Sequence, residues 1–290
     1  INNCKRCTIA MTYHKTDNNM HCHYCDASNE MTIFCNKCKL NTMDFKGYGT
    51  QKIKNIIEKQ FPGIRILRMD MDTVKKRGSH KIILDQFAKG DADILLGTQM
   101  IAKGLDFDNV TLVGVINADS GLFFPDFRSG EKVFQLIYQV SGRAGRREKP
   151  GRAIIQTYNP NDLYIQAATS LNTSKFYNIA MAQRQELNYP PFSRIGRIIF
   201  LGSNKNKVEN IAKKIFTKLN GNNNYQILGP TLAPLEKIRN MWRIHLIIKT
   251  LNKNNGHIGK LIYNNIGFSI FEKKWSGVRI VLDIDPISMM

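Results

Sequence analysis

The stretch ADILLGTQMIAKGLDFDNVTLVGVINAD, residues 92–119, decides the fold class of this chain. Two short apolar runs, 92–99 and 110–119, flank a loop of glycine and polar side chains. Similar runs at 64–70 and 152–158 alternate with segments of helical periodicity, which predicts a parallel β-sheet with helices on both faces. Ligands of such sheets meet the loops at the carboxyl ends of the strands. The sequence therefore predicts an α/β domain with its site in these loops.

Two helical segments precede these strands. KGYGTQKIKNIIEKQF, residues 46–61, predicts a helix that begins at Thr50 as a plausible N-cap. KKRGSHKIILDQFAKG, residues 75–90, predicts a second helix that closes at Gly90. The apolar stripe expected to be buried on the first helix consists of Ile53, Ile56, Ile57 and Phe61.

The loop after residue 97 carries groups suited to phosphate and sugar contacts. Thr98 and Gln99 offer a hydroxyl and an amide of the kind that contact a phosphodiester backbone, and Lys103 adds positive charge. Gly104 leaves backbone amides accessible, and Asp106 could accept a ribose hydroxyl or hold an arginine. A solvated strand-to-helix loop is the alternative interpretation.

The segment QLIYQVSGRAGRR, residues 135–147, predicts a helix that ends in two arginines, Arg143 and Arg146. Residues three apart share one face of a helix. Planar guanidinium groups placed in this way suit a γ-phosphate across an interface, where an arginine stabilises the charge of phosphoryl transfer. A basic helix end that complements its own dipole would look the same.

All six cysteines lie within the first 38 residues, in three Cys-x-x-Cys pairs. This clustering favours a metal in a reducing compartment over a disulfide framework. Two residues between thiols let a turn aim both sulfurs at one tetrahedral ion, and fourteen residues, the length of a short hairpin, separate the first pair from the second. The four cysteines expected to form one complete structural Zn²⁺ site are Cys4, Cys7, Cys22 and Cys25.

The third pair, Cys35 and Cys38, either lacks partners or borrows them from residues ahead of Ile1. Three histidines nearby could substitute, although a surface or supporting position fits each of them better. These histidines are His14, His21 and His23.

The 290 residues are enough for about two domains at 100–200 residues each. No apolar run approaches the length of a membrane span, so we expect no membrane-spanning helix. The net charge of +19 favours a nucleic-acid partner. A soluble basic protein from an organism that favours Lys and Asn codons is the alternative.

Residues 159–290 predict a further unit, with a helical connection followed by the order βαββαβ of a ferredoxin-like sandwich. Trp242 lies among the basic residues Lys237, Arg239 and Arg243, and an aromatic ring among positive charges suits single-stranded DNA. A buried tryptophan beside a solvated basic loop is the alternative. The first helix of this unit carries three further lysines, Lys213, Lys214 and Lys218.

GTQMIAKGLDF and QVSGRAGR resemble motifs V and VI of superfamily 2 helicases. With the cysteine pairs and four further segments, the chain resembles the carboxyl-terminal half of the primosomal replication-restart helicases along nearly its whole length. The resemblance implies three domains: a zinc-ribbon segment at 1–46, a RecA-like second helicase lobe at 47–158 and a DNA-binding α+β domain at 159–290. The four segments are NADSGLFFPDFRSGEKVFQL, LNYPPFSR, ILGPTLAPLEKIRNMWRIHLIIK and VLDIDP.

The resemblance also implies roles for individual residues. Thr50 and Thr98 would contact the backbone of the tracked DNA strand. The family carries four cysteine pairs that hold two zinc ions, so we expect one complete site here and a missing pair ahead of Ile1. The residues that would face ATP bound on the first lobe are Gly104, Asp106, Arg143 and Arg146.

No G-x-x-x-x-G-K-[ST] loop and no Asp-Glu-x-His box occurs in the sequence. Most of the machinery for ATP and Mg²⁺ is therefore missing, and we expect no ATPase activity from this chain alone. We expect a fragment of an ATP-dependent 3′-to-5′ DNA helicase that restarts stalled forks through primosome assembly. Such a protein would be bacterial, cytoplasmic and monomeric, and would bind forked and single-stranded DNA, primosome proteins and single-strand-binding protein.

Two alternatives to this function remain open. The chain could be a non-catalytic zinc-ribbon DNA-binding or scaffold protein with a degenerate RecA-like lobe, although a scaffold needs no arginine finger. It could also be another superfamily 2 translocase, which would leave the cysteine pairs unexplained.

Overall fold

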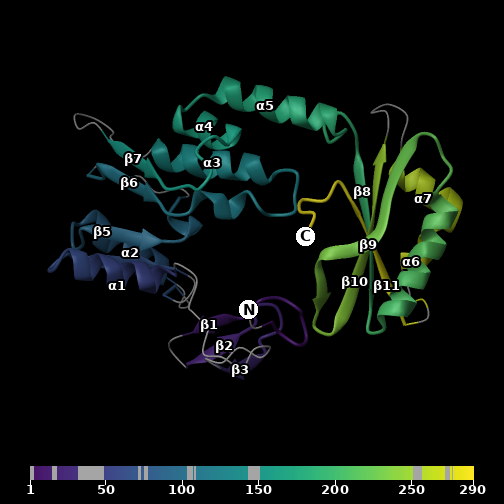
Figure 1. Ribbon diagram of the computed structural model, residues 1–290, viewed down its shortest axis with the longest axis horizontal. Helices are drawn as coiled ribbons and strands as arrows, with labels where there is room; N and C mark the ends of the chain where they lie inside the picture. Colours follow the sequence, from purple (N-terminus) through teal and green to yellow (C-terminus); the bar gives the residue numbers. More distant parts are fainter. Residues whose placement is uncertain are drawn as a thin grey trace. The chain divides into compact units, whose positions relative to one another are not determined.

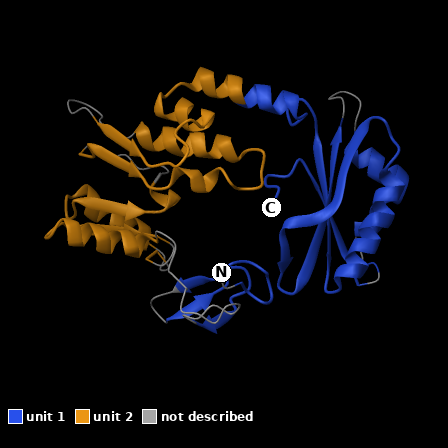
Figure 2. Ribbon diagram, viewed as in Figure 1, with its two compact units in different colours: residues 1–44, 180–290 blue, residues 45–179 orange. Residues whose placement is uncertain are grey.

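Figure 1 shows the computed structural model, which describes residues 3–14, 18–31, 49–70, 73–74, 78–102, 107, 109–142, 151–250, 257–271, 275 and 277–290. The chain forms two compact units, coloured separately in Figure 2. Unit 1 contains residues 1–44 and 180–290, and unit 2 contains residues 45–179. Unit 1 thus joins the cysteine-rich segment to the carboxyl-terminal residues. The predicted boundaries at 46 and 158 stay a prediction.

Unit 2 contains the parallel strands expected from the alternating apolar runs. Within the described residues, they form two parallel pairs, and each strand lies inside the run that predicted it. Gly97 ends one strand where its neighbour passes closely, because a Cβ there would overlap the carbonyl oxygen of Met69. The pairs are β4 (Ile66–Met69) with β5 (Ile94–Gly97), and β6 (Leu112–Val115) with β7 (Arg152–Ile155).

The helices of unit 2 differ in how deeply they are buried. Two of them, α1 and α2, contain no buried residue, whereas α3 buries Val133, Phe134 and Ile137. The Phe134 ring stacks on Phe176 with centroids 3.9 Å apart. The helices are α1 (Thr50–Gln60), α2 (Ser79–Ala88), α3 (Ser129–Ser141), α4 (Leu163–Thr169) and the start of α5 (Thr173–Glu186), with the 3₁₀ turns η1 (Gln99–Ala102) and η2 (Ala118–Gly121).

Two local predictions in this region were only partly correct. Helix α1 does begin at Thr50, but its N-cap is Gly49, and the Thr50 hydroxyl donates to Asp70 instead of accepting from an amide of its own helix. The helical connection that follows residue 158 is split into α4 and α5. Leu171 lies between them with φ of +52°, a left-handed conformation that interrupts a right-handed helix.

The carboxyl-terminal part of unit 1 confirms the βαββαβ order. Among the described residues it forms a four-stranded antiparallel sheet in the order β11-β8-β10-β9, as in a ferredoxin-like sandwich. Helices α6 and α7 lie on one face of this sheet (Figure 1). The elements are β8 (Ile195–Gly202), α6 (Lys205–Leu219), β9 (Tyr225–Ile238), β10 (Met241–Thr250), α7 (Ile258–Ile266), the 3₁₀ turn η3 (Phe268–Phe271) and β11 (Arg279–Ile284).

The core of this sandwich follows the period of two along its strands. Ile198 and Phe200 on β8, and Leu246 and Ile248 on β10, are completely buried and meet Ile215 of α6. Each fully buried side chain of this size contributes about 1.5–3 kcal/mol relative to an exposed one. The hydrophobic effect on this face therefore fixes the strand register, since a shift by one residue would turn the whole set away from the helices.

The cysteine-rich segment of unit 1 forms a small antiparallel sheet of three strands within its described residues. Its first two strands make the short hairpin that the spacing of the cysteine pairs predicted. The strands are β1 (Thr12–His14), β2 (Asn19–His21) and β3 (Ser28–Glu30).

In the part of the chain that the structure describes, no helix combines the length and apolar character needed to cross a lipid bilayer.

Candidate metal centre and nucleic-acid interface

Four cysteines of unit 1 converge on one point. Their ligand atoms all lie within 4.8 Å of one another, and three of the four side chains are buried. No histidine belongs to this cluster within the described residues. The set is Cys4, Cys7, Cys22 and Cys25, as the spacing predicted.

The two cysteine pairs share one backbone geometry. In the first turn the amide of Thr8 donates to the carbonyl oxygen of Cys4 at 2.7 Å, and in the second the amide of Asp26 donates to Cys22 at 2.9 Å. Thr8 and Asp26 hold the equivalent position, with φ of +52° and +57°. A left-handed residue after the second cysteine turns the chain back and leaves both sulfurs on the same side.

The environment of the sulfurs suits a thiophilic cation. Burial raises the pKa of the Cys7 thiol, and the backbone amide of Arg239, which donates to its sulfur at 3.2 Å, acts in the opposite direction by stabilising the thiolate. Four thiolates with no carboxylate among them form the ligand set of structural zinc and of some iron–sulfur sites. The residues present therefore fit a tetrahedral metal ion that is closed to other ligands.

Trp242 marks a second notable surface of unit 1. The ammonium groups of Lys205 and Lys237 lie 5.1 and 5.3 Å from the centroid of its ring, within the range of a cation–π contact. Lys237 was expected beside this ring, whereas Lys205, at the start of α6, was not. The register of the sheet explains why Lys205 lies beside the ring, because Trp242 pairs with Gly202 at the end of β8, three residues before Lys205.

The other two basic residues predicted around Trp242 lie elsewhere. Arg239 donates from its Nε to the carbonyl oxygen of Tyr24 at 3.0 Å. Arg243 is only 8% exposed and donates to the carbonyl oxygen of Leu235 at 3.2 Å. Neighbouring residues of a strand point to opposite faces, so Arg243 cannot share the surface of Trp242. The tryptophan is thus flanked by lysines and not by arginines.

In unit 2, three of the predicted site residues lie close to strand ends. Thr98 and Gln99 follow the carboxyl end of β5 and are exposed. Thr50 begins α1 and donates to Oδ2 of the buried Asp70 at 2.5 Å, while Arg68 forms an ion pair with the same oxygen at 2.9 Å. Sequence reasoning missed Asp70, although a carboxylate at the carboxyl end of a predicted strand was the available signal.

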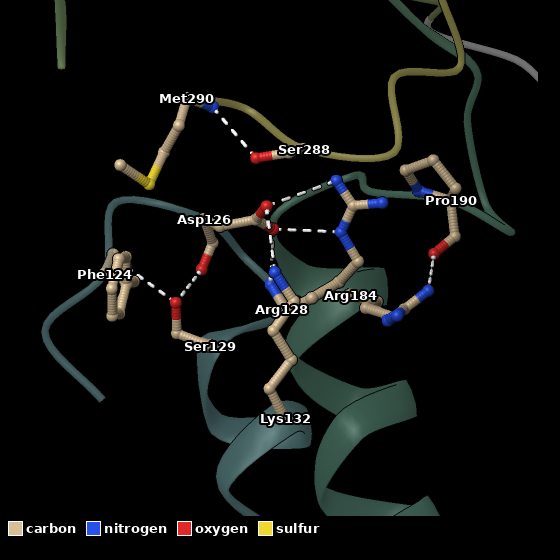
Figure 3. Close-up of polar contacts among 9 residues, drawn as sticks. All are labelled: Phe124, Asp126, Arg128, Ser129, Lys132, Arg184, Pro190, Ser288 and Met290. Atoms are coloured by element: carbon tan, nitrogen blue, oxygen red, sulfur yellow. Dashed lines mark hydrogen bonds and ion pairs between the residues drawn. The ribbon is translucent and has the colours of Figure 1, made fainter. Parts of the chain in front are cut away.

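The segment before α3 is held by one carboxylate, drawn in Figure 3. The Asp126 side chain is 1% exposed and pairs with Arg128 at 2.9 Å and Lys132 at 3.6 Å. The hydroxyl of Ser129 donates to the carbonyl oxygens of Phe124 and Asp126 at 2.6 and 2.7 Å. These contacts fix the start of the helix whose far end leads to Arg143.

Asp119 ties the end of β6 to the end of β7. Its carboxylate accepts hydrogen bonds from the hydroxyl of Thr157 at 2.8 Å and from the amides of Tyr158 and Asn159 at 2.9 and 3.2 Å. Burial by itself would raise the pKa of this carboxyl, but these bonds favour the charged form and its pKa is lowered. Asp119 thus holds the carboxyl edge of the β6–β7 pair.

Several predicted site residues lie outside the described residues, so their placement stays a prediction. They are the loop residues Lys103, Gly104 and Asp106, the arginines Arg143 and Arg146, and the third cysteine pair, Cys35 and Cys38.

Two family profiles match this chain. The profile described as Helicase conserved C-terminal domain matches residues 16–148, and the one described as Primosomal protein N C-terminal domain matches residues 185–287. The first match includes the parallel strands β4, β5 and β6, and the second includes the whole four-stranded antiparallel sheet β11-β8-β10-β9.

Curated relatives match almost the full chain. Replication restart protein PriA of Bacillus subtilis is 42% identical over 289 residues, which are 99% of this chain and 36% of the relative. Proteins of the same name from Synechocystis and Chlamydia pneumoniae are 40% and 37% identical, over 85% and 98% of this chain and 30% and 38% of the relatives. The chain thus spans between 30% and 38% of the length of these three relatives.

Proposed function

Because this chain belongs to the PriA family of replication restart proteins, we propose that it supplies the second motor lobe and a DNA-binding domain to an ATP-dependent 3′-to-5′ DNA helicase. One observation carries the proposal. The helicase match covers residues 45–148 of the unit with parallel strands together with residues 16–44 of unit 1, and the primosomal match covers the ferredoxin-like sheet, so sequence and fold together support each assigned part.

In the proposed motor, nucleotide and DNA meet at the carboxyl edge of the unit 2 strands. Arg143 and Arg146 stabilise the charge that develops on a transferred phosphoryl group. Gly104 and Asp106 line the same side of the nucleotide-binding site. Thr98, Gln99, Lys103 and Thr50 bind the backbone of the tracked strand. ATP with Mg²⁺, when bound, supplies the free energy of translocation.

The bond between Thr50 and Asp70 supports this role by orienting the start of α1. With the Thr50 side chain held by Asp70, the amino-terminal end of α1 contacts a phosphate of the DNA backbone, since the dipole of a helix favours an anion at this end. Thr50 then acts through its backbone, whereas Thr98 and Gln99, which are exposed, act through their side chains.

In unit 1 we propose that Zn²⁺ occupies the four-cysteine cluster as a structural ion. The fit of four thiolates without a carboxylate supports zinc, and a segment of this size lacks a core that would fold it unaided. The Trp242 ring and its two lysines form the proposed contact with single-stranded DNA, through stacking on a base and pairing with phosphates.

The proposed partners are those of a replication-restart helicase: forked and single-stranded DNA, primosome proteins and single-strand-binding protein. We propose that the protein acts in the bacterial cytoplasm as a monomer.

ATP hydrolysis tests the motor proposal. In a full-length protein that contains this sequence, Arg143→Ala and Arg146→Ala should each reduce DNA-stimulated turnover by about 10³-fold or more while ATP binding persists. The 290-residue chain alone should show no turnover. Robust DNA-stimulated hydrolysis by the isolated chain, or full activity of both variants, would refute the assignment.

DNA binding tests the proposed interface. Trp242→Ala should weaken binding of a single-stranded oligonucleotide by about 1–3 kcal/mol, measured by fluorescence anisotropy at fixed salt. Tyr263→Ala is a matched control, because this exposed ring has no cation–π contact with any lysine in the part of the chain that the structure describes. Equal effects of the two substitutions would contradict the interface.

A further inference from the structure

The turn between β9 and β10 lies against the metal centre although more than two hundred residues separate them in sequence. The amide of Arg239 donates to the Cys7 sulfur at 3.2 Å, and the amide of Asn240 donates to the carbonyl oxygen of Arg6 at 2.9 Å. Ile238 packs against the buried cysteines. A hairpin of the carboxyl-terminal sheet therefore closes one side of the four-cysteine cluster.

This turn contacts both cysteine turns. At the turn that contains Cys4 and Cys7, the ammonium group of Lys237 also donates to the carbonyl oxygen of Lys5 at 3.4 Å. The side chain of Arg239 reaches the other turn, where its Nε donates to the carbonyl oxygen of Tyr24 at 3.0 Å. One residue, Arg239, thus links the first pair of ligands through its backbone and the second pair through its side chain.

The backbone of this turn is strained. Arg239 and Asn240 have φ of +49° and +64°, as in a two-residue hairpin turn of type I′. Such turns favour Asn and Gly, because in the left-handed region a Cβ lies too close to the following carbonyl oxygen, a cost that Gly avoids and that Asn offsets by local hydrogen bonds. An arginine persists there only if its surroundings hold it, and the bonds to Cys7 and Tyr24 are what hold it.

We infer that the β9–β10 turn is part of the metal site, with Arg239 as a positioning residue for the thiolates, and that metal occupancy in turn holds this hairpin. An N–H bond to a metal-bound thiolate stabilises its charge and orients the sulfur, so the turn strengthens metal binding. The coupling is reciprocal, because a turn that favours the metal-bound cluster must itself be favoured by the metal. This coupling needs no DNA and no nucleotide, and it rests only on the proposed occupancy of the four-cysteine cluster by a metal ion.

A direct test measures the bond from Arg239 to Cys7 in the full 290-residue chain. When cadmium replaces zinc, a scalar coupling across an N–H···S bond transfers magnetisation between the metal nucleus and the amide proton. We expect a coupling from the bound cadmium to the amide of Arg239 and none to that of Asn240, whose acceptor is a carbonyl oxygen. A cadmium-loaded chain without the Arg239 coupling would overturn the inference.

A second test follows the hairpin when the metal is removed. After chelation under reducing conditions, peptides that cover residues 235–242 should exchange amide hydrogens at least about tenfold faster, while peptides from α6 and β8 keep their rates. Unchanged exchange in the turn, or an equal increase across the whole sheet, would contradict a local coupling. A Trp275→Phe variant leaves Trp242 as the single tryptophan, and its emission should shift on metal removal.

A pair of variants separates the side chain of Arg239 from its backbone. Arg239→Gly removes the bond to Tyr24 but suits the left-handed backbone, so metal transfer to a chelator should accelerate by about two- to tenfold while the hairpin itself is not weakened. Asn240→Gly keeps its amide bond and its positive φ and should transfer metal at the parental rate. Equal transfer rates in the two variants would show that the Arg239 side chain does not position the site.

Discussion

The antiparallel sheet of unit 1 and the parallel strand pairs of unit 2 differ in how completely their apolar groups are covered. Along β8, seven of the eight residues are buried, whereas no residue of β5, β6 or β7 is. Helix α1 has the apolar spacing of a packed helix, and yet it buries none of its residues. An amphipathic pattern therefore shows which face of a helix can be buried. How much that face stabilises the fold depends on the elements that pack against it.

Truncation of apolar side chains should show the largest difference between the two regions. Phe200→Ala in the sheet of unit 1 should cost about 3–5 kcal/mol of unfolding free energy, because it leaves a cavity in a fully buried core. Ile56→Ala in α1, at a side chain that is 45% exposed, should cost no more than about 0.5 kcal/mol. Hydrogen exchange of peptides from each unit along a urea series measures the loss of unfolding free energy in each variant. Similar costs of the two substitutions would contradict this difference between the units and show that α1 is covered in solution.

In unit 2, helix α3 packs closely against α4, and a glycine at this contact tests the packing. A Cβ at Gly130 of α3 would overlap the ring of Tyr164, so Gly130→Ala should destabilise unit 2 by about 1–3 kcal/mol through overpacking. At Gly114 in β6 a Cβ would meet open space, so Gly114→Ala serves as the control and should be nearly neutral. Peptide-level hydrogen exchange of α3 and α4 provides the measurement. A neutral Gly130→Ala variant would mean that α4 is not packed against α3.

The buried carboxylate of Asp119 should give unit 2 a pH-dependent contribution. Its pKa is lower in the folded than in the unfolded chain, so the contribution is complete above the unfolded value of about 3.9 and is lost as the pH falls through the folded value. Asp119→Asn should therefore cost about 1–3 kcal/mol near pH 7 and progressively less below about pH 4. Stability measured by hydrogen exchange at several pH values checks the trend.

Asp162 provides the matched control for Asp119. Its carboxylate caps α4 by accepting from the amides of Tyr164 and Ile165, a role that asparagine performs equally well. Asp162→Asn should therefore leave stability near pH 7 almost unchanged. A cost equal to that of Asp119→Asn would show that the effect reflects loss of charge in general and not the Asp119 site.

The smallest expected effect concerns an exposed pair in unit 2. The hydrogen bond and charge of Arg65, whose guanidinium lies 2.6 Å from Asp93, lower the pKa of that carboxyl to about 2. Arg65→Ala should raise this pKa part of the way toward the ordinary value of about 3.9, because the backbone amide of residue 65 still donates to Oδ2 of Asp93 at 2.9 Å. NMR titration of the carboxyl carbon measures the change. The stability of the unit at pH 7 should hardly change, because solvent screens exposed pairs. A pKa that stays near 2 in the variant would assign the shift to another cause.

Most of the fold could be predicted because it depends on patterns within short stretches. The four apolar runs of unit 2 and the βαββαβ order of unit 1 follow from periodicity, and the four-cysteine cluster follows from the spacing of two pairs. The N-cap at Thr50 was predicted wrongly, since side-chain preference alone does not reveal a competing acceptor such as Asp70. The expected surroundings of Trp242 were half correct, because strand alternation buries Arg243 and sheet register brings in Lys205.

Patterns in the amino-acid sequence were enough to predict which segments become strands and helices and which four cysteines converge, because both depend on residues close together in the chain. The three-dimensional fold was needed to show that the strained turn at Arg239 closes the four-cysteine cluster, and that the apolar stripe of α1 is half exposed. Contacts of this kind depend on sheet register and on which surfaces meet, and no local preference encodes the distance between two atoms that are 232 residues apart.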